Sequence, residues 1–600
     1  MLGSMMHEQF YKCRKFAAPE LGAYAGSVFD TESPAAGQSM TSDGGELALA
    51  FAGEEFTVDD VGSLLARYSE EGLSLLPRLN GLFSGLLIDR RNRRAILFND
   101  RFGFERIYVA ETADGTFFAS EAKALLAVLP ELRSFDADGL ADFLRFGCTL
   151  ENRTLFRGVR LLPAASQWLF ETGCCRKSSY FTPQVWESQA AVGEQEFDDE
   201  FAATFQRILP RYLTKTSSLG ISLTAGLDTR MIMACLPNSV PNPVCYTFAG
   251  EKKTTLDARL SSLVASESGL RHEIIRIGAD FFGSFQSHAD KTVFVSDGTF
   301  GVLGAHETYF NAQARRLASV RLTGNYGSEV LRGMSTFKPV GLDPSILERE
   351  SRPLVARSSE DAARPEHPVT FAATREIPWN LFGNAAAGRA QVTLRTPYLD
   401  NELVALAYRA PRASRWSGDA AVRFIRRVRP AVARIPTDRG LLGNAPSGLG
   451  RAKHFLSEAA CKLDYFYSEG LPHPLAALNP LMELGVGATV GGSHKFLPYR
   501  IWFREQLATY VREALAEAVG RANPIWDLNV VARLASDHIR GRKNYVREIN
   551  VILTLDAVDR LLLRGTTRPD ITDSIATYSG ADDAGAEPVP AASPAAVNVS

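Results

Sequence analysis

The chain has 600 residues, of which 45% are hydrophobic and 22% are charged, and this globular composition excludes a largely disordered protein. Lys and Arg number 66 against 68 Asp and Glu, so the net charge of −2 gives no support to bulk nucleic-acid binding. Seven scattered cysteines without a CxxC pair fit a reducing compartment and exclude a cysteine zinc site. The N-terminus lacks a signal-peptide core and no apolar run is long enough to span a bilayer, so we expect a cytoplasmic protein of two or three domains with no membrane partner.

The first third of the chain has the pattern of antiparallel strands. Apolar runs on both sides of the charged turn 90–94 predict a hairpin over 79–98, and the Asp114-Gly115 pair predicts another turn. The other elements expected here are strands at 106–110 and 116–119 and helices at about 59–69 and 120–128. Together they predict a layered α+β domain.

Strands and helices alternate after residue 190. The elements expected are a helix over 194–213, a strand over 219–223, a helix from Met231, a strand over 244–248, a helix over 255–268 and strands over 273–277 and 320–323. Such alternation is typical of a parallel, doubly wound α/β sheet. The chain is mostly helical after 390. From 565 onward it consists largely of small and polar residues, which predicts a disordered tail.

The segment Ser222–Arg230 (Ser-Leu-Thr-Ala-Gly-Leu-Asp-Thr-Arg) has the composition of an anion-binding loop. Small residues let the backbone approach an oxyanion, and the helix that follows supplies unpaired N–H groups and a positive dipole end. The carboxylate of Asp228 is suited to a cation that bridges phosphates. On its own, the same segment also fits an ordinary turn in which Asp228 caps the helix.

A second segment, 320–333, repeats this design with an apolar strand, a glycine-rich turn, a carboxylate and the start of an apolar helix. In a parallel sheet both turns would lie at the carboxyl edge, where such folds bind ligands. We therefore expect Asp228 and Glu329 to face each other across a shared Mg²⁺.

These residues resemble a known family. Segment 222–230 is similar to the pyrophosphate-binding loop (Ser-Gly-Gly-Leu-Asp-Ser) of asparagine synthetases, β-lactam synthetases and lasso-peptide cyclases, and 323–333 resembles their second glycine-rich loop. Segment 394–404 resembles their Arg-x-Pro-Phe-Leu-Asp signature. Segments 99–103 and 118–126 resemble the Asp-Arg-x-Gly and Ala-Ser-Glu-x-Lys-Ala-Leu segments of their amidotransferase-type domain.

The resemblance implies two domains and a tail. Residues 1–190 would form a degenerate class II glutamine amidotransferase-like domain, an α+β sandwich of the Ntn type. Residues 191–564 would form the ATP-binding domain, an α/β doubly wound parallel sheet of the pyrophosphatase (adenine nucleotide α-hydrolase-like) type, and 565–600 the tail.

The resemblance also implies the cofactors ATP and Mg²⁺ and a set of site residues. Phosphates would be bound by Thr224, Ala225, Gly226, Leu227, Asp228 and Thr229. The adenosine would be lined by Leu223, Phe248, Thr323 and Gly324. Asp228 would be the first metal ligand, and the second would be Glu329 if one residue is inserted or Ser328 if none is.

Several positions depart from the family pattern. Asn325 replaces the Glu with which asparagine synthetases handle their substrate, and it cannot act as a base. Arg439 is the only cation near the expected position of the catalytic lysine, and an Arg stabilises charge but does not readily transfer protons. These changes argue against plain asparagine synthesis.

Glutamine hydrolysis is expected to be lost. The family nucleophile is a cysteine at position 2, where this sequence has Leu2, and Cys13 is internal. The glutamine-binding Gly-Glu-x-Tyr-Asn is replaced by Gly-Glu-Glu-Phe-Thr at 53–57, which lacks the oxyanion-hole Asn. The family-like segments that remain in this domain are interpreted as turn and packing residues, so we expect the domain to serve as a structural support for the ligase half.

The sequence therefore predicts a carbon–nitrogen ligase that adenylates a carboxylate and transfers it to an amine or ammonia, releasing AMP and pyrophosphate. The expected partners are a small-molecule or peptide carboxylate and an amine donor, with a homodimer left open. Two alternatives remain: an intramolecular cyclase of the β-lactam or lasso-peptide type, and a non-catalytic scaffold.

Overall fold

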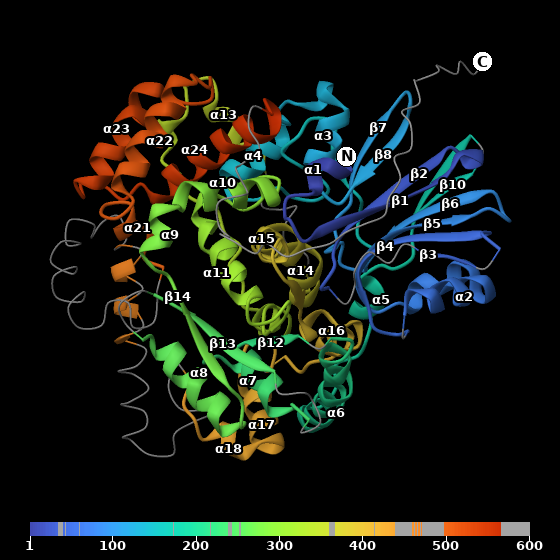
Figure 1. Cartoon of the computed structure of the whole chain (residues 1–600). Coiled ribbons are helices and arrows are strands. Elements are labelled where there is room, and N and C mark those ends of the chain that lie inside the picture. The colour runs from blue at the N-terminus through green and yellow to red at the C-terminus, as the bar shows by residue number, and fades with distance from the viewer. Residues whose placement is uncertain are drawn as a thin grey trace, which may run out of the picture.

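The computed structural model describes residues 1–33, 40–42, 44–58, 60–171, 173–216, 218–237, 243–250, 254–358, 367–412, 414–437, 459–460, 462–464, 466–468, 470 and 497–565. Arg439 and the predicted tail from residue 566 onward lie outside these ranges. Figure 1 shows the strands of the N-terminal third on one side of the molecule and the C-terminal helices on the other. Among the described residues, no helix combines the length and apolar character that a membrane span requires.

Antiparallel strands build the N-terminal unit, as the turn signals predict. They form a six-stranded sheet in the order β11-β10-β6-β5-β4-β3, a three-stranded sheet in the order β8-β7-β9, and the pair β1-β2. The strands are β1 (Tyr11–Ala18), β2 (Ala23–Asp30), β3 (Met40–Thr41), β4 (Leu47–Glu55), β5 (Gly81–Asp89), β6 (Arg94–Asn99), β7 (Tyr108–Thr112), β8 (Gly115–Ala119), β9 (Arg160–Leu161), β10 (Ser166–Glu171) and β11 (Cys174–Ser179). The helices are α1 (Leu2–Met5), η1 (Pro19–Leu21), α2 (Val61–Glu71), η2 (Gly72–Arg78), α3 (Ala122–Val128), η3 (Pro130–Leu132), α4 (Ala137–Phe146) and α5 (Gln184–Glu187).

Both faces of the six-stranded sheet are buried, which explains the nearly continuous apolar sequence of β5. Phe83 and Leu87 pack with α2 on one face, whereas Leu86 and Ile88 pack toward β7 on the other. The far side of β7 packs against α3. The order helix, sheet, sheet, helix is the layered α+β arrangement that the sequence predicts. Its assignment to the Ntn type stays a prediction.

The second unit contains a five-stranded parallel sheet in the order β14-β13-β12-β15-β16. Its strands are β12 (Leu219–Ser222), β13 (Val244–Ala249), β14 (His272–Arg276), β15 (Val320–Thr323) and β16 (Thr393–Arg395). β12 pairs with β13 on one side and β15 on the other, and Ser222 is level with Thr323. The strand order therefore reverses between β12 and β15, where open parallel sheets bind their ligands. The predicted parallel α/β sheet is confirmed, while its pyrophosphatase-type classification stays a prediction.

Helices cover both faces of this sheet. One face packs with α6, α7, α16 and α17, and α11 lies on the opposite side from α8 (Figure 1). The helices are α6 (Glu194–Leu213), α7 (Leu227–Ala234), α8 (Leu256–Glu267), α9 (Ala279–Gly283), α10 (Phe285–Val295), η4 (Val302–Gly304), α11 (Ala305–Arg315), α12 (Gly327–Arg332), η5 (Pro344–Ile346), α13 (Arg352–Val355), α14 (Pro368–Phe371), the π-helical η7 (Ala372–Leu381), α15 (Phe382–Arg389), η8 (Pro397–Leu399), α16 (Asn401–Tyr408), α17 (Asp419–Val428), α18 (Pro430–Ala433), α21 (Tyr499–Trp502), α22 (Ala508–Gly520), α23 (Leu528–Ile539), α24 (Val546–Val558) and the π-helical η10 (Asp559–Leu563). The C-terminal helices α22, α23 and α24 pack together, and α24 lies against α10.

One element boundary matters for the site. The helix predicted from Met231 begins four residues earlier, at Leu227, because Gly226 has an extended conformation and serves as its N-cap. Asp228 and Thr229 therefore lie in the first turn of α7 and not in the loop before it. At this place the N–H groups of a helix have no partner within the helix.

Candidate functional site

The two glycine-rich turns lie against each other, as the sequence predicts. They follow the adjacent strands β12 and β15, and they touch where Gly324 and Gly327 face the start of α7. A Cβ atom on Gly324 would lie 2.7 Å from the backbone N of Thr229, and one on Gly327 would lie 2.6 Å from Cγ of Asp228. Only glycine allows this approach, so both glycines are explained by the contact between the turns.

The first turn is shaped by its two hydroxyl groups. Thr229 Oγ1 donates to the carbonyl O of Thr224 at 2.9 Å and lies 3.0 Å from Thr224 Oγ1. Thr247 Oγ1 donates to the carbonyl O of Leu223 at 2.6 Å, and the Leu223 side chain is fully buried. Both threonine hydroxyls thus stabilise the turn in this structure. The resemblance instead assigns Thr224 and Thr229 to the binding of phosphates.

A carboxylate already accepts a hydrogen bond from this turn. Asp257, in the first turn of α8, accepts from the backbone N of Ala225 at 2.6 Å. An anionic oxygen therefore stands at one of the backbone donors that the sequence assigns to phosphate. No local sequence pattern points to Asp257, because it lies 32 residues away and on another helix.

Asp228 is the most unusual group of the site. Its Oδ2 lies 2.6 Å from Nη2 of Arg332, while its buried Oδ1 has no hydrogen-bond partner among the described residues. Burial raises the pKa of Asp228 to about 6, although the Arg332 guanidinium opposes this increase. A buried carboxylate oxygen without a partner is costly and suggests that a ligand completes its environment.

Glu329 lies near Asp228 in the first turn of α12, next to Ser328, whose Oγ donates to Glu329 Oε2 at 3.3 Å. Burial raises the pKa of Glu329 to about 7, and the negative charges of Glu376 and Asp228 add to the increase. Both predicted metal ligands are therefore in one region, although Arg332 is the group bound to Asp228. The described residues contain no cluster of three or more His, Cys, Asp or Glu side chains that could hold a metal ion.

The residues predicted to line an adenosine lie at the same edge of the sheet. Phe248 follows Tyr246, which is level with Ser222, so its ring lies beyond the end of β12. That ring stacks on Phe310 with centroids 4.4 Å apart, and the guanidinium carbon of Arg321 lies 4.9 Å from its centre. In the second turn, Thr323 Oγ1 donates to Asn325 Oδ1 at 2.9 Å.

Arg230 is a further residue of the site that the sequence did not reveal. It is fully buried and donates to the carbonyl O of Ala225 at 3.2 Å and to that of Pro436 at 2.9 Å. It thereby holds the segment that leads to the predicted catalytic Arg439 against the first turn. Arg439 itself lies outside the described residues. The sequence feature that could have indicated Arg230 is its position directly before the apolar helix sequence 231–235.

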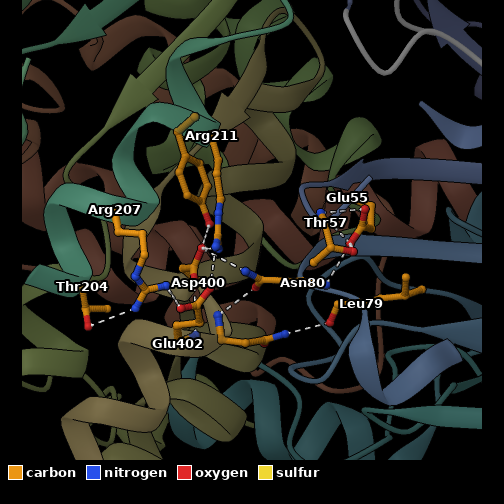
Figure 2. A network of polar contacts seen from close by, with 11 residues as sticks. Glu55, Thr57, Leu79, Asn80, Thr204, Arg207, Arg211, Asp400 and Glu402 are labelled. Atoms are coloured by element: carbon orange, nitrogen blue, oxygen red, sulfur yellow. Dashed lines mark hydrogen bonds and ion pairs between the residues drawn. The ribbon is translucent and has the colours of Figure 1, made fainter. Parts of the chain in front are cut away.

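The N-terminal unit meets the second unit through buried polar contacts. Both carboxylate oxygens of Glu54, in the segment that replaces the glutamine-binding motif, accept hydrogen bonds from Arg395 at 2.6–3.1 Å. Figure 2 shows a second group of contacts, in which Asn80 reaches Asp400 across the interface. Cys13 lies exposed in β1, paired with Val28.

A cavity of about 260 Å³ lies between the two units. Residues of both units line it, among them Phe51, Glu54, Tyr108, Glu121, Arg389 and Leu394. The space is therefore formed where the two units meet, and neither unit forms it alone.

Comparison with known proteins relates the chain to one family of enzymes. Residues 46–181 match the model of a glutamine amidotransferase domain. A Mycobacterium tuberculosis protein that is provisionally named a glutamine-hydrolysing asparagine synthetase is 26% identical over 367 residues, which are 58% of this chain and 52% of the relative. Asparagine synthetase 1 of Bacillus subtilis is 22% identical over 300 residues, covering 49% of this chain and 46% of the relative. Asparagine synthetase B of Escherichia coli is 22% identical over 372 residues, covering 59% and 58%.

The chain thus carries a glutamine amidotransferase domain followed by a unit built on a parallel sheet. It is related to the asparagine synthetases. It spans about half the length of the curated relatives that it matches. A solved glutamine phosphoribosylpyrophosphate amidotransferase from B. subtilis covers 39% of this chain and 47% of its own at 10% identity, but its TM-score of 0.16 carries no conclusion about the fold.

Proposed function

We propose that the chain is an ATP- and Mg²⁺-dependent carbon–nitrogen ligase. It would join the α-phosphate of ATP to a substrate carboxylate, with release of pyrophosphate, and an amine would then attack the acyl-adenylate and release AMP. The observation that carries the proposal is the pair of touching glycine-rich turns at the point where the strand order reverses, with the buried, unpartnered Oδ1 of Asp228 between them. Relatedness to asparagine synthetases supports the reaction class.

The chemistry of the residues fits Mg²⁺, which prefers carboxylate oxygens. Asp228 offers Oδ1, which has no hydrogen-bond partner among the described residues. Burial raises the pKa of Glu329, so a nearby cation would stabilise its ionised form. Ser328 is the alternative second ligand. When bound, Mg²⁺ would neutralise negative charge on the phosphates and on the departing pyrophosphate.

Residues of the two glycine-rich turns and of the neighbouring strands would bind the phosphates and the adenosine of the nucleotide. The backbone of Thr224–Thr229 and the N-terminal turn of α7 would bind the phosphates, because unpaired N–H groups and the helix dipole both favour an anion there. Leu223, Phe248 and the pair Thr323-Gly324 would line the adenosine. Arg439 would stabilise charge on the phosphates without acting as a proton carrier.

The positive charge of Arg332 would keep Asp228 ionised until the cofactor binds. It lies 2.6 Å from one carboxylate oxygen and opposes the increase in the pKa that burial causes. Likewise, Asp257 would leave the backbone N of Ala225 when a phosphate takes its place.

We further propose that glutamine is not the nitrogen donor. The Glu54 carboxylate is bound on both oxygens by Arg395, and Thr57 stands at the position of the oxyanion-hole Asn of the resemblance. The nucleophile would then be ammonia or an amine, either on a second substrate or on the activated molecule itself.

A specific observation favours a second candidate, the non-catalytic scaffold. Arg332 binds the Asp228 carboxylate, and Asp257 binds the backbone N of Ala225. The groups that the ligase would use to bind Mg²⁺ and phosphate therefore have partners within the chain. The two candidates differ in whether the chain binds a nucleotide at all.

Binding of a hydrolysis-resistant ATP analogue to the full chain, measured by calorimetry with and without Mg²⁺, separates them. The ligase predicts Mg²⁺-dependent binding that Asp228→Asn weakens by about 100-fold, since a phosphate-bridging cation contributes several kcal/mol. Asp198→Asn, which alters a carboxylate between α6 and α17, serves as the matched control and should bind like the parent. An absence of Mg²⁺-dependent binding to the parent would favour the scaffold. Pyrophosphate release screened over candidate carboxylates would then identify the substrate.

A further inference from the structure

One short segment contacts both the amidotransferase domain and the two glycine-rich turns. We call it the connecting segment, Arg395–Asn401, which comprises the end of β16, η8 and the start of α16. It follows directly from the parallel sheet, on the strand next to β15. Residues at its two ends contact the amidotransferase domain, and two residues between them contact the glycine-rich turns.

Arg395 makes the first contact with the amidotransferase domain. Its Nε and Nη2 donate to the two carboxylate oxygens of Glu54 at 2.8 and 2.6 Å. Its Nη1 donates to the carbonyl O of Tyr212 at 3.0 Å and to that of Thr214 at 2.8 Å. The guanidinium is fully buried, so the loss of Glu54 would leave a buried positive charge without its counter-ion.

The other end of the segment makes the second contact, which Figure 2 shows. Asn80 Nδ2 donates to Oδ2 of the fully buried Asp400 at 3.0 Å, and Asn80 Oδ1 accepts from the backbone N of Asn401 at 2.9 Å. Asn401 Nδ2 donates to the carbonyl O of Leu79 at 2.9 Å. The amide of Asn80 is therefore used as both donor and acceptor, which fixes the segment in position and direction.

Between these two contacts lie two residues that touch the glycine-rich turns. Thr396 Oγ1 donates to the carbonyl O of Asn325, in the second turn, at 2.8 Å. Tyr398 is fully buried and its hydroxyl donates to the carbonyl O of Asp228 at 2.7 Å. Each turn thus has one backbone carbonyl held by the connecting segment.

We propose that Thr396 and Tyr398 are positioning residues for the nucleotide site, and that the amidotransferase domain keeps them in place through Glu54 and Asn80. The inference rests on the proposed function and deepens it. The amidotransferase domain would support the ligase through contacts with the connecting segment, independently of any glutamine chemistry. Because Pro397 and the turn of η8 restrict the backbone between the contacts, a shift at Arg395 would also move Thr396 and Tyr398.

The first test compares two matched ion pairs between the domains. Glu54→Gln weakens the pair with Arg395, whereas Asp30→Asn weakens a pair in which both carboxylate oxygens bind Arg315, at 2.5 and 3.0 Å, and which includes no residue of the connecting segment. Both variants should lower the thermal midpoint, because each removes a carboxylate counter-ion from a buried or mostly buried guanidinium. Only Glu54→Gln should weaken binding of the Mg²⁺–ATP analogue, by about tenfold, the effect of one misplaced hydrogen bond.

The second test acts at the other end of the segment and does not depend on Glu54. Thr396→Val removes the hydroxyl that binds Asn325, and Thr396→Ser restores it, so the first should weaken analogue binding and the second should recover it. In a double-mutant cycle, Glu54→Gln and Thr396→Val should be non-additive, whereas Asp30→Asn and Thr396→Val should add.

The outcomes distinguish the two proposals. A parent chain that binds no Mg²⁺–ATP analogue overturns the proposed function, and the inference with it. If the parent binds but Glu54→Gln and Asp30→Asn behave alike, and Thr396→Val binds like Thr396→Ser, the positioning role is wrong while the proposed function stands.

Discussion

Two carboxyl groups at the centre of the site are partly buried, and this burial raises the pKa of each, to about 6 for Asp228 and about 7 for Glu329. Proteins seldom keep such groups in their interior unless a ligand or a reaction needs them. Here they lie beside a pair of backbone turns suited to phosphate. At the scale of single residues, the ionised forms of both carboxyl groups are therefore disfavoured by their surroundings.

Glu329→Gln should make the protein more stable at pH 8 and leave its stability unchanged near pH 4.5. The pKa of Glu329 is higher in the folded chain than its ordinary value of 4.5. The stability that this group contributes is therefore present below about pH 4.5 and is lost as the pH rises through about 7. A shift of this size corresponds to roughly 3 kcal/mol at most, and a measured gain of about 1–3 kcal/mol is expected.

The measurement is the thermal midpoint of the parent and the variant at both pH values, with chelator present and nucleotide absent. Glu267→Gln, at an exposed position at the end of α8, serves as the control and should show no such pH dependence. If the variant and the parent were equally stable at pH 8, the prediction that burial makes the ionised form of Glu329 unfavourable would be wrong.

The residues that the sequence could predict are those with a local signature. Asp228, Gly324 and Glu329 stand in short segments whose glycines and carboxylates follow apolar strands, and the structure brings these segments together. Their partners could not be found in this way. Arg332 lies 104 residues from Asp228, and the pairing depends on how two turns meet in space.

At the scale of elements, the contact between the turns is set by glycines. A Cβ on Gly324 would meet the backbone N of Thr229 at 2.7 Å, and one on Gly327 would meet the Asp228 carboxyl carbon at 2.6 Å. Backbone cannot move away without displacing α7. Gly226 differs, since the nearest atom to its Cβ would be Thr224 Oγ1 at 3.4 Å.

Gly324→Ala and Gly327→Ala should therefore weaken binding of the Mg²⁺–ATP analogue strongly, by about 100-fold or more, whereas Gly226→Ala should weaken it less than tenfold. Calorimetric titration of the three variants provides the comparison. Far-ultraviolet circular dichroism shows whether each remains folded. Equal losses in all three would mean that the close contact between the turns is unimportant for the site.

Element boundaries were predictable where an apolar period was clear. The helix over 194–213 coincides with α6, and the parallel strands fall within one or two residues of their expected places. The start of α7 was predicted too late, because the small and polar residues 224–229 have no helical period of apolar residues. The extended conformation of Gly226 decides that boundary, and sequence composition does not reveal it.

At the scale of the whole molecule, a family-like segment of the amidotransferase domain makes a contact with the second unit that the sequence did not indicate. The segment at 118–126 was interpreted as turn and packing residues, but Lys123 is buried and lies 3.2 Å from Asp297 of the second unit. Asp297 also accepts from the backbone N of Ala122 at 2.7 Å. Because the contact joins residues 174 positions apart, no local pattern could have predicted it.

The purified chain should release no glutamate from glutamine above the buffer rate, with or without ATP. The acid that occupies the glutamine-binding segment, Glu54, is bound by Arg395, and Cys13 lies within β1, where its backbone pairs with Val28. An enzymatic assay for glutamate at saturating glutamine provides the measurement. Glutaminase activity that disappears on Cys13→Ala would overturn this prediction.

The chain should unfold in one cooperative transition, although it has two recognisable units. Its large apolar clusters contain residues of both: Leu125 and Leu140 pack in one cluster with Phe310 and Ile552. Separating the units would expose this shared core, and it would also break the buried Arg395–Glu54 pair. Differential scanning calorimetry of the full chain should therefore show one peak. A fragment ending at residue 190 should bind a hydrophobic dye and lack a cooperative transition, because half of its core partners are missing. Two resolved peaks, or a fragment that unfolds cooperatively on its own, would show that the amidotransferase domain is independently stable and only rests against the ligase unit.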